Sequence, residues 1–329
     1  MRFSPGIYEH AAALIHSRPW TVSHDADLLA DAHRVAWERY HHPLVVAGID
    51  VYNLEPEAYG ALIPEPAGNN IPSIAQHPCS EVEDLLELTP LNPLAHDRIT
   101  GVLKAAESLA ATCENSRVLV PVCGPFALAI GLIGMDELLM SVVEDPGLLS
   151  EALGHLLEGQ RAYMRAVYER GLEPLIFESG TTPPLLPAEA FRRIEAPLLA
   201  ELMEFGRGIG GQAPGCIIGG DAAAVAEPLF ETGPGLVIAP SETDRAAFME
   251  VARRFPQTHV RVNMSATVLL VNDFGKVRAE ADRCLDLARE RDNTSVGCGV
   301  VPYEADPDLV CRVADHVENQ IESQMQRFR

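Results

Sequence analysis

Polar side chains follow several short apolar runs of this sequence, each at the point where the run ends. Asp50 and Glu178 come directly after two of these runs, and Asn263 follows a third. A carboxylate or amide buried without a partner costs free energy, so polar residues that gather at the ends of buried strands indicate a binding site. Carboxyl groups there can act as general acids within reach of a substrate. Asp50 could instead only cap a turn.

Glycines and one cysteine add to this set of candidate residues. Asp221 follows two glycines, which allow close approach of a ligand to a helix N-terminus, although a helix cap is an equally ordinary role for it. Cys298 lies between two glycines, where a cysteine is poorly suited to fill a core, so we expect it to line the pocket. The predicted catalytic residues are Asp50, Glu178 and Asp221, and the predicted substrate-binding residues are Tyr52, Gly124, Gly220, Asn263 and Cys298.

The apolar runs alternate with helical patterns along the whole chain, which is typical of βα units and a parallel sheet. Seven or eight such units in one chain of 329 residues suit a closed barrel, so the fold class is α/β, a (β/α)8 TIM-type barrel. An open doubly wound sheet would normally bring a glycine-rich loop after the first run, and Asp50-Val51-Tyr52-Asn53 is no such loop. The expected strands lie at 43–50, 117–122, 174–178, 215–219, 235–240, 259–263 and 294–298.

A weaker run at 61–63 is either the eighth strand or part of an excursion from the barrel. Residues 52–95 are rich in Pro, Asn and Glu and lack clear periodicity. We therefore expect an excursion after the first strand that lies over one barrel mouth, with a possible small hairpin. No linker or low-complexity stretch divides the chain, so we predict one domain, residues 1–329.

Helix boundaries are indicated by caps and prolines. Asp25 begins a predicted helix that ends at Tyr40, and Asp145-Pro146 begins another that runs to about residue 170. Pro197 should kink or split the helix that begins near residue 187. Further predicted caps are Asp221, Thr243 and Asp273, and Asp306-Pro307 begins the last helix.

Composition limits the classes of function. The net charge of −22 repels nucleic acid and anionic membranes, so neither is an expected partner. The seven cysteines form no C-x-x-C pair, which fits a reducing compartment. No window reaches the ~18 apolar residues of a membrane span, and the N-terminus lacks a signal-peptide pattern. We expect a cytoplasmic protein.

Five segments carry a family resemblance through their order and spacing together, since each alone is weak. They are Asp50 to Ser73, Val122-Cys123-Gly124-Pro125-Phe126, Pro183 to Pro197, Gly219-Gly220-Asp221, and Gly297-Cys298-Gly299-Val300 with Pro302. With these segments the chain resembles the methyltransferase-like branch of the uroporphyrinogen decarboxylase superfamily. The resemblance covers about residues 25–317, nearly the whole chain, and it implies a (β/α)8 barrel with its site at the C-terminal mouth.

The resemblance also raises the question of zinc. In the zinc-dependent thiol methyltransferases of this family, a His-x-Cys pair and a later cysteine bind the metal, which holds a thiol acceptor as thiolate. Cys298 matches the later cysteine, but Ile217 and Gly219 stand at the positions of the pair. We therefore expect no zinc; if a metal is bound, Glu178, Asp221 and Cys298 are the candidate ligands.

The leading hypothesis is a methyltransferase that moves a methyl group between a small-molecule or folate donor and a corrinoid protein. The expected cofactor is a corrinoid on a partner protein, or tetrahydrofolate. One alternative is a cofactor-free decarboxylase or lyase, although the R-Q-A-G-R-Y segment of the decarboxylase branch is missing and Arg2 and Arg18 are isolated. Another alternative is a non-catalytic ligand-binding barrel.

Overall fold

The strands form one parallel sheet that is nearly closed into a barrel. The structure is a computed structural model that describes residues 2–271 and 273–327, with side chains up to residue 323 in the last helix. The strand order is β1-β8-β7-β6-β5-β4-β3-β2, and all paired strands are parallel. The strands are β1 Ser4–Gly6, β2 Leu44–Val46, β3 Arg117–Cys123, β4 Glu173–Glu178, β5 Gly215–Ile218, β6 Leu236–Ala239, β7 His259–Met264 and β8 Thr294–Val300.

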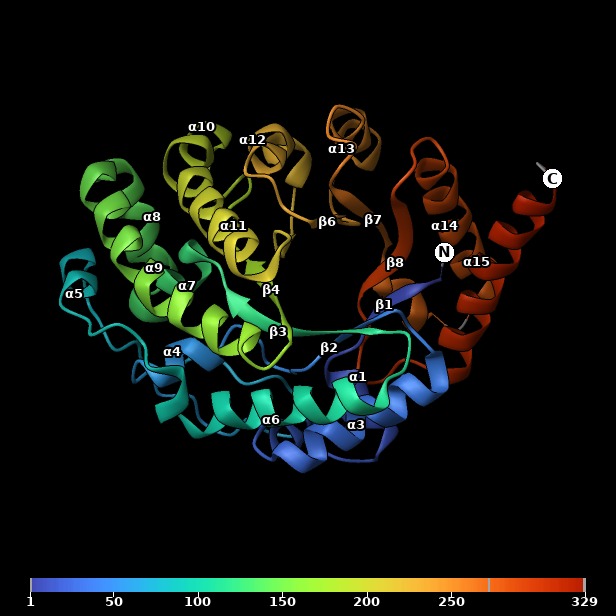
Figure 1. Cartoon of the computed structure of the whole chain (residues 1–329), viewed down its shortest axis with the longest axis horizontal. Helices are drawn as coiled ribbons and strands as arrows, with labels where there is room; N and C mark the ends of the chain where they lie inside the picture. The colour runs from blue at the N-terminus through green and yellow to red at the C-terminus, as the bar shows by residue number, and fades with distance from the viewer. Residues whose placement is uncertain (1, 272, 328–329) are drawn as a thin grey trace.

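Helices surround the strands as an outer ring (Figure 1), which confirms the predicted (β/α)8 fold class. The α-helices of this ring and its loops are α1 Glu9–Leu14, α2 Pro19–Ser23, α3 Ala26–Tyr40, α4 Leu54–Ala58, α5 Val82–Leu86, α6 Asp97–Thr112, α7 Pro125–Ile133, α8 Met135–Glu144, α9 Pro146–Tyr168, α10 Ala188–Ala190, α11 Ala196–Gly210, α12 Ala226–Glu231, α13 Arg245–Ala252, α14 Phe274–Ala288 and α15 Pro307–Arg327. The 3-10 turns are Pro93–Ala95, Ala222–Val225 and Ala266–Leu270, and Phe191–Glu195 is a π-helical turn.

Most predicted helix starts are confirmed, because the caps act as expected. The Asp25 carboxylate accepts from the amides of Asp27 and Leu28, and the Asp273 carboxylate caps α14 in the same way. Pro197 was expected to kink or split its helix; it is the second residue of α11 and follows a π-helical turn, so the helix changes its hydrogen-bond pattern there but continues without a gap. The cap of α13 is Asp244 rather than Thr243.

The first strand of the barrel is β1, which the sequence pattern did not reveal. The run 61–63 is not the eighth strand, since Leu62 forms only an isolated antiparallel bridge with Gln76. Consequently the excursion follows the second strand, β2, rather than the first. It contains α4, α5 and a 3-10 turn, and its residues Ile71 and Pro72 reach the barrel mouth.

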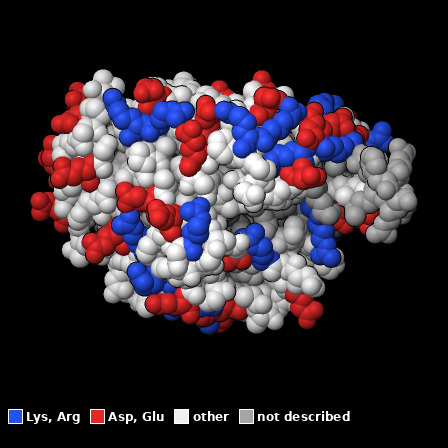
Figure 2. All heavy atoms as spheres, turned by 45° about the horizontal axis from the view of Figure 1, so that its top comes forward, with Lys and Arg blue, Asp and Glu red and all other residues white. Residues whose placement is uncertain are grey.

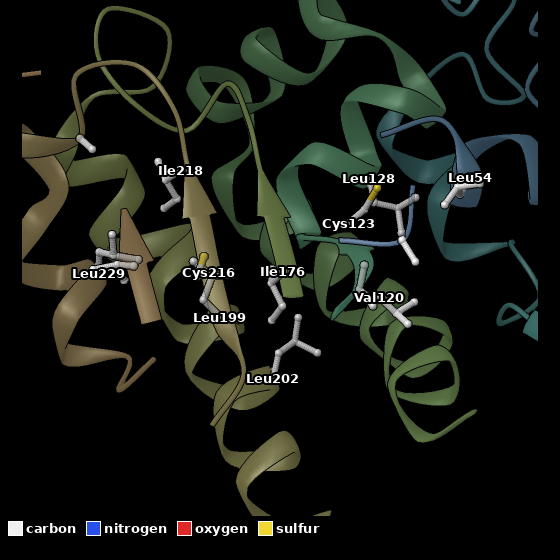
Figure 3. Packing of buried hydrophobic residues seen from close by; sticks show 14 of the residues in the cluster. Leu54, Val120, Cys123, Leu128, Ile176, Leu199, Leu202, Cys216, Ile218 and Leu229 are labelled. Carbon is white, nitrogen blue, oxygen red and sulfur yellow. The ribbon is translucent and has the colours of Figure 1, made fainter. Parts of the chain in front are cut away.

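The core has two parts, because successive strand residues point to opposite faces of the sheet. Cys216 and Ile218 of β5 pack outward, in the core between the strands and helices such as α11, which contributes Leu199 and Leu202 (Figure 3). A smaller cluster fills the inside of the barrel. It consists of Tyr8, Val51, Leu119, Leu175, Phe177 and Leu236, with Leu44, Val46 and Ile217 packed against it.

No single described helix is long and apolar enough to cross a membrane. The pair α7 and α8 passes such a test together, with a bend of 115° between them. Apart from Ile130, the residues of α7 are buried within the protein, as in a core helix. On the face drawn in Figure 2, acidic and basic side chains are interspersed.

Candidate functional site

A cavity of about 450 Å³ opens at the carboxyl ends of the strands. Residues that end or follow the strands form its mouth, among them Gly6, Asp50, Pro240 and Asn263. This is the end of a barrel at which ligands bind. Most of the wall is apolar and comes from Ile49, Val51, Ile71, Phe177, Ile217, Ile238 and Val300.

Three aromatic rings form one side of this cavity. Tyr8 and Tyr52 each meet Phe177 edge-on, with ring centroids 6.1 Å and 5.9 Å apart. The Tyr52 hydroxyl donates to the backbone oxygen of Glu178 at 3.2 Å, which ties the excursion to the end of β4. Burial raises the pKa of Tyr8 to about 12, so its hydroxyl remains a proton-bearing donor at neutral pH. The aromatic side therefore offers apolar contact and one phenolic donor.

Asp50 lines the cavity as a buried carboxylate held by a cation. The guanidinium of Arg98, at the start of α6, donates to Asp50 and also to Glu57 of α4. The amide Nδ2 of Asn53 lies 3.4 Å from the second oxygen of Asp50. The ion pair with Arg98 holds the Asp50 side chain in place at the cavity wall. Asp50 is thus suited to accept hydrogen bonds or to offset positive charge.

Glu9 is a second carboxyl group of the cavity, and it belongs to the first turn of α1. It is half-buried, and burial raises the pKa of its carboxyl above the ordinary value. A raised pKa keeps a carboxylic acid protonated at higher pH, which is what a general acid requires. Glu9 is therefore a better candidate for proton donation than Asp50.

The floor of the cavity carries Arg261 and Asn263 of β7. Both side chains point into the barrel because their neighbours Val260, Val262 and Met264 pack outward in the core. The Arg261 Nε–H donates to Asn263 Oδ1 at 3.0 Å. Burial lowers the pKa of the Arg261 guanidinium, since a charge is costly away from water. The predicted binding residue Asn263 thus meets the cavity together with a cation.

Glu178 lies behind the cavity and not in its lining. Its neighbour Phe177 faces the barrel interior, so Glu178 faces α7, where its carboxyl oxygens accept from the amides of Phe126 and Ala127, each at 3.2 Å. A Cβ at Gly124 would lie 1.7 Å from Glu178 Oε1. Glu178 was expected to be catalytic, but it does not face the cavity. Gly124 was expected to bind substrate, but it makes room for the Glu178 carboxyl instead of a ligand.

Glu178 has an acidic neighbour, Glu195 of the π-helical turn. Both side chains are fully buried, and neither carboxyl oxygen of Glu195 has a hydrogen-bond partner among the described residues. Burial, together with the proximity of the second carboxyl, raises the pKa of Glu178, and burial raises the pKa of Glu195. Glu178 and Glu195 thus form a buried carboxyl pair that lies outside the cavity and tends to keep its protons.

The other predicted residues also lie outside the lining. Asp221 is exposed, makes no capping bond, and accepts from the Thr243 hydroxyl at 2.8 Å. Gly220 has a φ of +76° and packs against Thr182. Cys298 is fully buried in the outer core, and burial raises its pKa to about 12. Cys298 was expected to line the pocket, but the structure places it in the outer core. Its glycine neighbours, and not the cysteine, face the barrel.

A metal does not fit the conditional ligand set of Glu178, Asp221 and Cys298. Among the described residues, no three His, Cys, Asp or Glu side chains come together as metal ligands. The two positions that correspond to the His-x-Cys pair, Ile217 and Gly219, both line the cavity but offer no donor side chain. The residues present therefore do not fit the zinc site of the thiol methyltransferases.

The structure brings the predicted residues Asp50, Tyr52 and Asn263 together in one pocket lining, and their roles stay predictions; Tyr8, Glu9 and Arg261 of the same lining were not predicted. Tyr8 and Glu9 were missed because β1, which precedes them, has only three residues. Arg261 could have been found from the sequence, because polar and β-branched residues alternate along β7. This alternation predicts that residues 259, 261 and 263 share one face.

Comparisons with known proteins agree with the barrel fold. The family profile described as Uroporphyrinogen decarboxylase (URO-D) matches residues 7–320. A methyltransferase from Methanosarcina mazei has a similar structure, with a TM-score of 0.81 and 18% sequence identity over 97% of this chain and 94% of that chain. At this identity the likeness establishes the fold. A search of curated proteins finds no match.

Proposed function

The chain belongs to the uroporphyrinogen decarboxylase family, and we propose that it is a methyltransferase that moves a methyl group between a small molecule and a corrinoid protein without a zinc-bound thiol. The observation that carries the proposal is the cavity itself. At the positions of the family's zinc ligands, Ile217 makes the wall of the cavity apolar and Gly219 contributes no side chain. A methylated small molecule fits such a wall better than a metal-held thiol does.

The residues of the cavity supply what a methyl donor needs. Phe177, Tyr8 and Tyr52 give the cavity an aromatic side against which the apolar part of a methyl donor can pack. When the bond between an ether oxygen or amine nitrogen and the methyl group breaks, the leaving atom takes a proton. Glu9 is placed to donate it, while the Asp50 carboxylate can bind a hydroxyl or ammonium group of the donor.

Folate remains a second source of the methyl group. Methyltetrahydrofolate is larger than a methoxylated acid, and it would extend from the cavity over Ile71 and Pro72 of the excursion. A protein that takes folate should transfer its methyl group to free cob(I)alamin as well, so the same assay covers both donors.

The test is methyl transfer to cob(I)alamin, which is detected as a change in the absorbance of the corrinoid. The donors are methoxylated and N-methylated small molecules and methyltetrahydrofolate. We expect turnover with at least one donor class, and turnover by Glu9→Gln that is lower by about 100-fold. No transfer from any donor, together with release of CO2 from a carboxylic acid, would replace this proposal by the decarboxylase alternative.

The pH dependence gives an independent check on Glu9. A general acid acts in its protonated form, so wild-type turnover should fall as pH rises through the raised pKa of Glu9. Glu9→Gln should lose this limb of the profile and keep its low activity at all pH values. Glu242→Gln, an exposed residue of the same lining, is the matched control and should keep the wild-type limb.

Decarboxylation of a porphyrinogen is a weaker candidate on the chemistry of the lining. Such a substrate carries many carboxylates and needs several cations. The described lining offers one basic residue, Arg261, beside the acidic residues Glu9, Asp50 and Glu242. A non-catalytic binding barrel would bind a donor and yield no turnover in the same assay.

A further inference from the structure

Arg261 is a buried cation that lacks an anionic partner in the described part of the chain. Its residue exposure is 7%, and it lines the floor of the cavity. None of the ion pairs between described residues includes it, whereas the other cation next to the cavity, Arg98, is paired with both Asp50 and Glu57. Burial of a charge without a counter-ion is costly, so an unpaired guanidinium at this depth requires an explanation.

The barrel holds this guanidinium in a fixed place. A Cβ at Gly297 would lie 2.8 Å from Arg261 Cδ, so the glycine leaves the channel along which the side chain runs from β7 across β8 towards β1. Nε donates to Asn263 Oδ1 at 3.0 Å, and Nη1 lies 3.4 Å from Ser4 Oγ. A guanidinium has five N–H donors, and these two contacts leave most of them for a ligand.

The donors next to Arg261 point to an anion of low charge. Because a guanidinium only donates, Asn263 must turn its oxygen to Arg261, which leaves its Nδ2 donor without a partner among the described residues. The Tyr8 hydroxyl also lines the cavity and has no hydrogen bond to a described residue. The remaining charged groups of the lining, Glu9, Asp50 and Glu242, would repel a second negative charge.

We propose that Arg261 and Asn263 bind the carboxylate of a small monocarboxylic substrate at the cavity floor, with Tyr8 as a third donor. This rests on the proposed function and deepens it, since the acid is then the methyl donor. The carboxylate anchors the molecule in the barrel, and its methyl-bearing end lies towards the mouth, where Glu9 stands and an acceptor can reach it. A planar carboxylate matches the guanidinium fork, whereas a phosphate dianion would bring a second charge close to the acidic lining.

The test is direct binding, measured by calorimetry without any methyl acceptor. The probes are methoxyacetate and 4-methoxybenzoate, each compared with its neutral amide, and inorganic phosphate. We expect the wild-type protein to bind at least one acid more tightly than its amide. Arg261→Gln should bind that acid ~10- to 100-fold more weakly and leave amide binding nearly unchanged, the size expected for hydrogen bonds to a charged group.

The matched control is Arg117→Gln. Arg117 also belongs to a barrel strand, but it is exposed, pairs with Glu173 and lines a cavity at the opposite end of the barrel. This variant removes the same charge from the protein and should keep the wild-type preference for acid. If Arg117→Gln loses the preference as fully as Arg261→Gln, the general field of the protein and not the proposed site selects the anion.

Thermal unfolding separates a ligand-binding role of Arg261 from a structural one. Removal of an unpaired buried charge should leave the Tm of ligand-free Arg261→Met equal to or above that of the wild type, and the acid should no longer raise it. A lower Tm in the variant, with the acid still raising it as in the wild type, would assign Arg261 to the fold and overturn the proposal.

The binding results are read separately from methyl transfer. Selective acid binding that depends on Arg261, without turnover, would keep the carboxylate site and remove the methyltransferase proposal. Turnover of neutral donors, with equal binding of acids and amides, would keep the methyltransferase proposal and remove the carboxylate site. Binding of phosphate in preference to both acids, or of none of these anions, would overturn the carboxylate assignment.

Discussion

Asp50 and Glu178 both follow an apolar strand, yet they occupy opposite sides of the barrel wall. Asp50 comes after the end of β2, faces the cavity and pairs with Arg98. Glu178 is the last residue of β4, one position after the inward-facing Phe177, so it faces the helix layer and meets the first turn of α7. A shift of one residue along a strand therefore separates a carboxylate that can meet a ligand from one that cannot.

The two regions also differ in how they satisfy a buried charge. The region of Asp50 contains a guanidinium and an amide donor. The region of Glu178 contains a second acid, Glu195, and no cation pairs with either in the described chain; burial raises the pKa of both. The first region pairs a carboxyl group with a cation, whereas the second buries two carboxyl groups without one.

The largest expected effect is the difference in methyl-transfer turnover between a variant of Asp50 and a variant of Glu178. Asp50→Asn should lower turnover at low donor concentration by ~10- to 100-fold, because the cavity loses the carboxylate that binds the donor. Glu178→Gln should change turnover by less than about threefold, since Glu178 lies outside the lining and glutamine keeps a hydrogen-bond acceptor for α7. The reverse order of effects would place the chemistry behind β4.

The stability of Asp50→Asn must be measured alongside its turnover. Arg98 retains Glu57 as a partner, so the cation is not left alone. We expect the free energy of unfolding to fall by ~1–3 kcal/mol, the cost of hydrogen bonds to a charged group. A variant that is folded at the assay temperature and still inactive separates the two effects.

A smaller effect is expected on the pH dependence of stability. Because Glu195 has a raised pKa in the folded state, the folded protein keeps its proton while the unfolded chain releases it, so stability falls as pH rises from the ordinary glutamate range through the raised pKa. Glu195→Gln cannot titrate and should flatten this fall, with a gain of ~1–2 kcal/mol at about pH 8 and little change at about pH 4. Denaturant unfolding at both pH values is the measurement.

A contrary result for Glu195→Gln is also informative. A loss of stability at the higher pH would mean that the carboxylate is ionised and satisfied in the folded protein. The buried pair would then resemble the region of Asp50, and the contrast between the two regions would fail.

The smallest expected effect is at the contact between the two regions. Tyr52 is 36% exposed, and its hydroxyl donates to the backbone oxygen of Glu178. Tyr52→Phe keeps the edge-on contact with Phe177 and should lower the free energy of unfolding by at most ~1 kcal/mol. Its thermal unfolding curve should nearly coincide with that of the wild type, whereas Tyr52→Ala should also lose the aromatic wall and unfold earlier.

The fold could be predicted from the sequence where strands are long and β-branched, as in β3 and β7. It could not be predicted at β1, because three residues, Ser4–Gly6, are too few to show an alternation. The excursion was recognised from its composition, yet its place after the second strand depends on β1. The missing strand thus explains why the excursion was placed after the first strand.

The candidate site was predictable only in part, for a related reason. A residue at a strand end can face either side of the wall, and the direction depends on where the strand begins in the sheet. Asp50 and Asn263 face the cavity, whereas Glu178 and Cys298 face the helices. Glycines beside a cysteine suggested a ligand, but Gly297 gives space to Arg261 instead.

The most direct test of a zinc-free site is the zinc content of the purified protein, measured by elemental analysis together with methyl transfer before and after treatment with a chelator. We expect far less than about one zinc per chain and equal turnover in both samples, because no described residues of the cavity form a set of metal ligands. About one zinc per chain that is lost in Cys298→Ser, with turnover lost on chelation, would contradict it and would restore the zinc-bound thiol as the methyl acceptor.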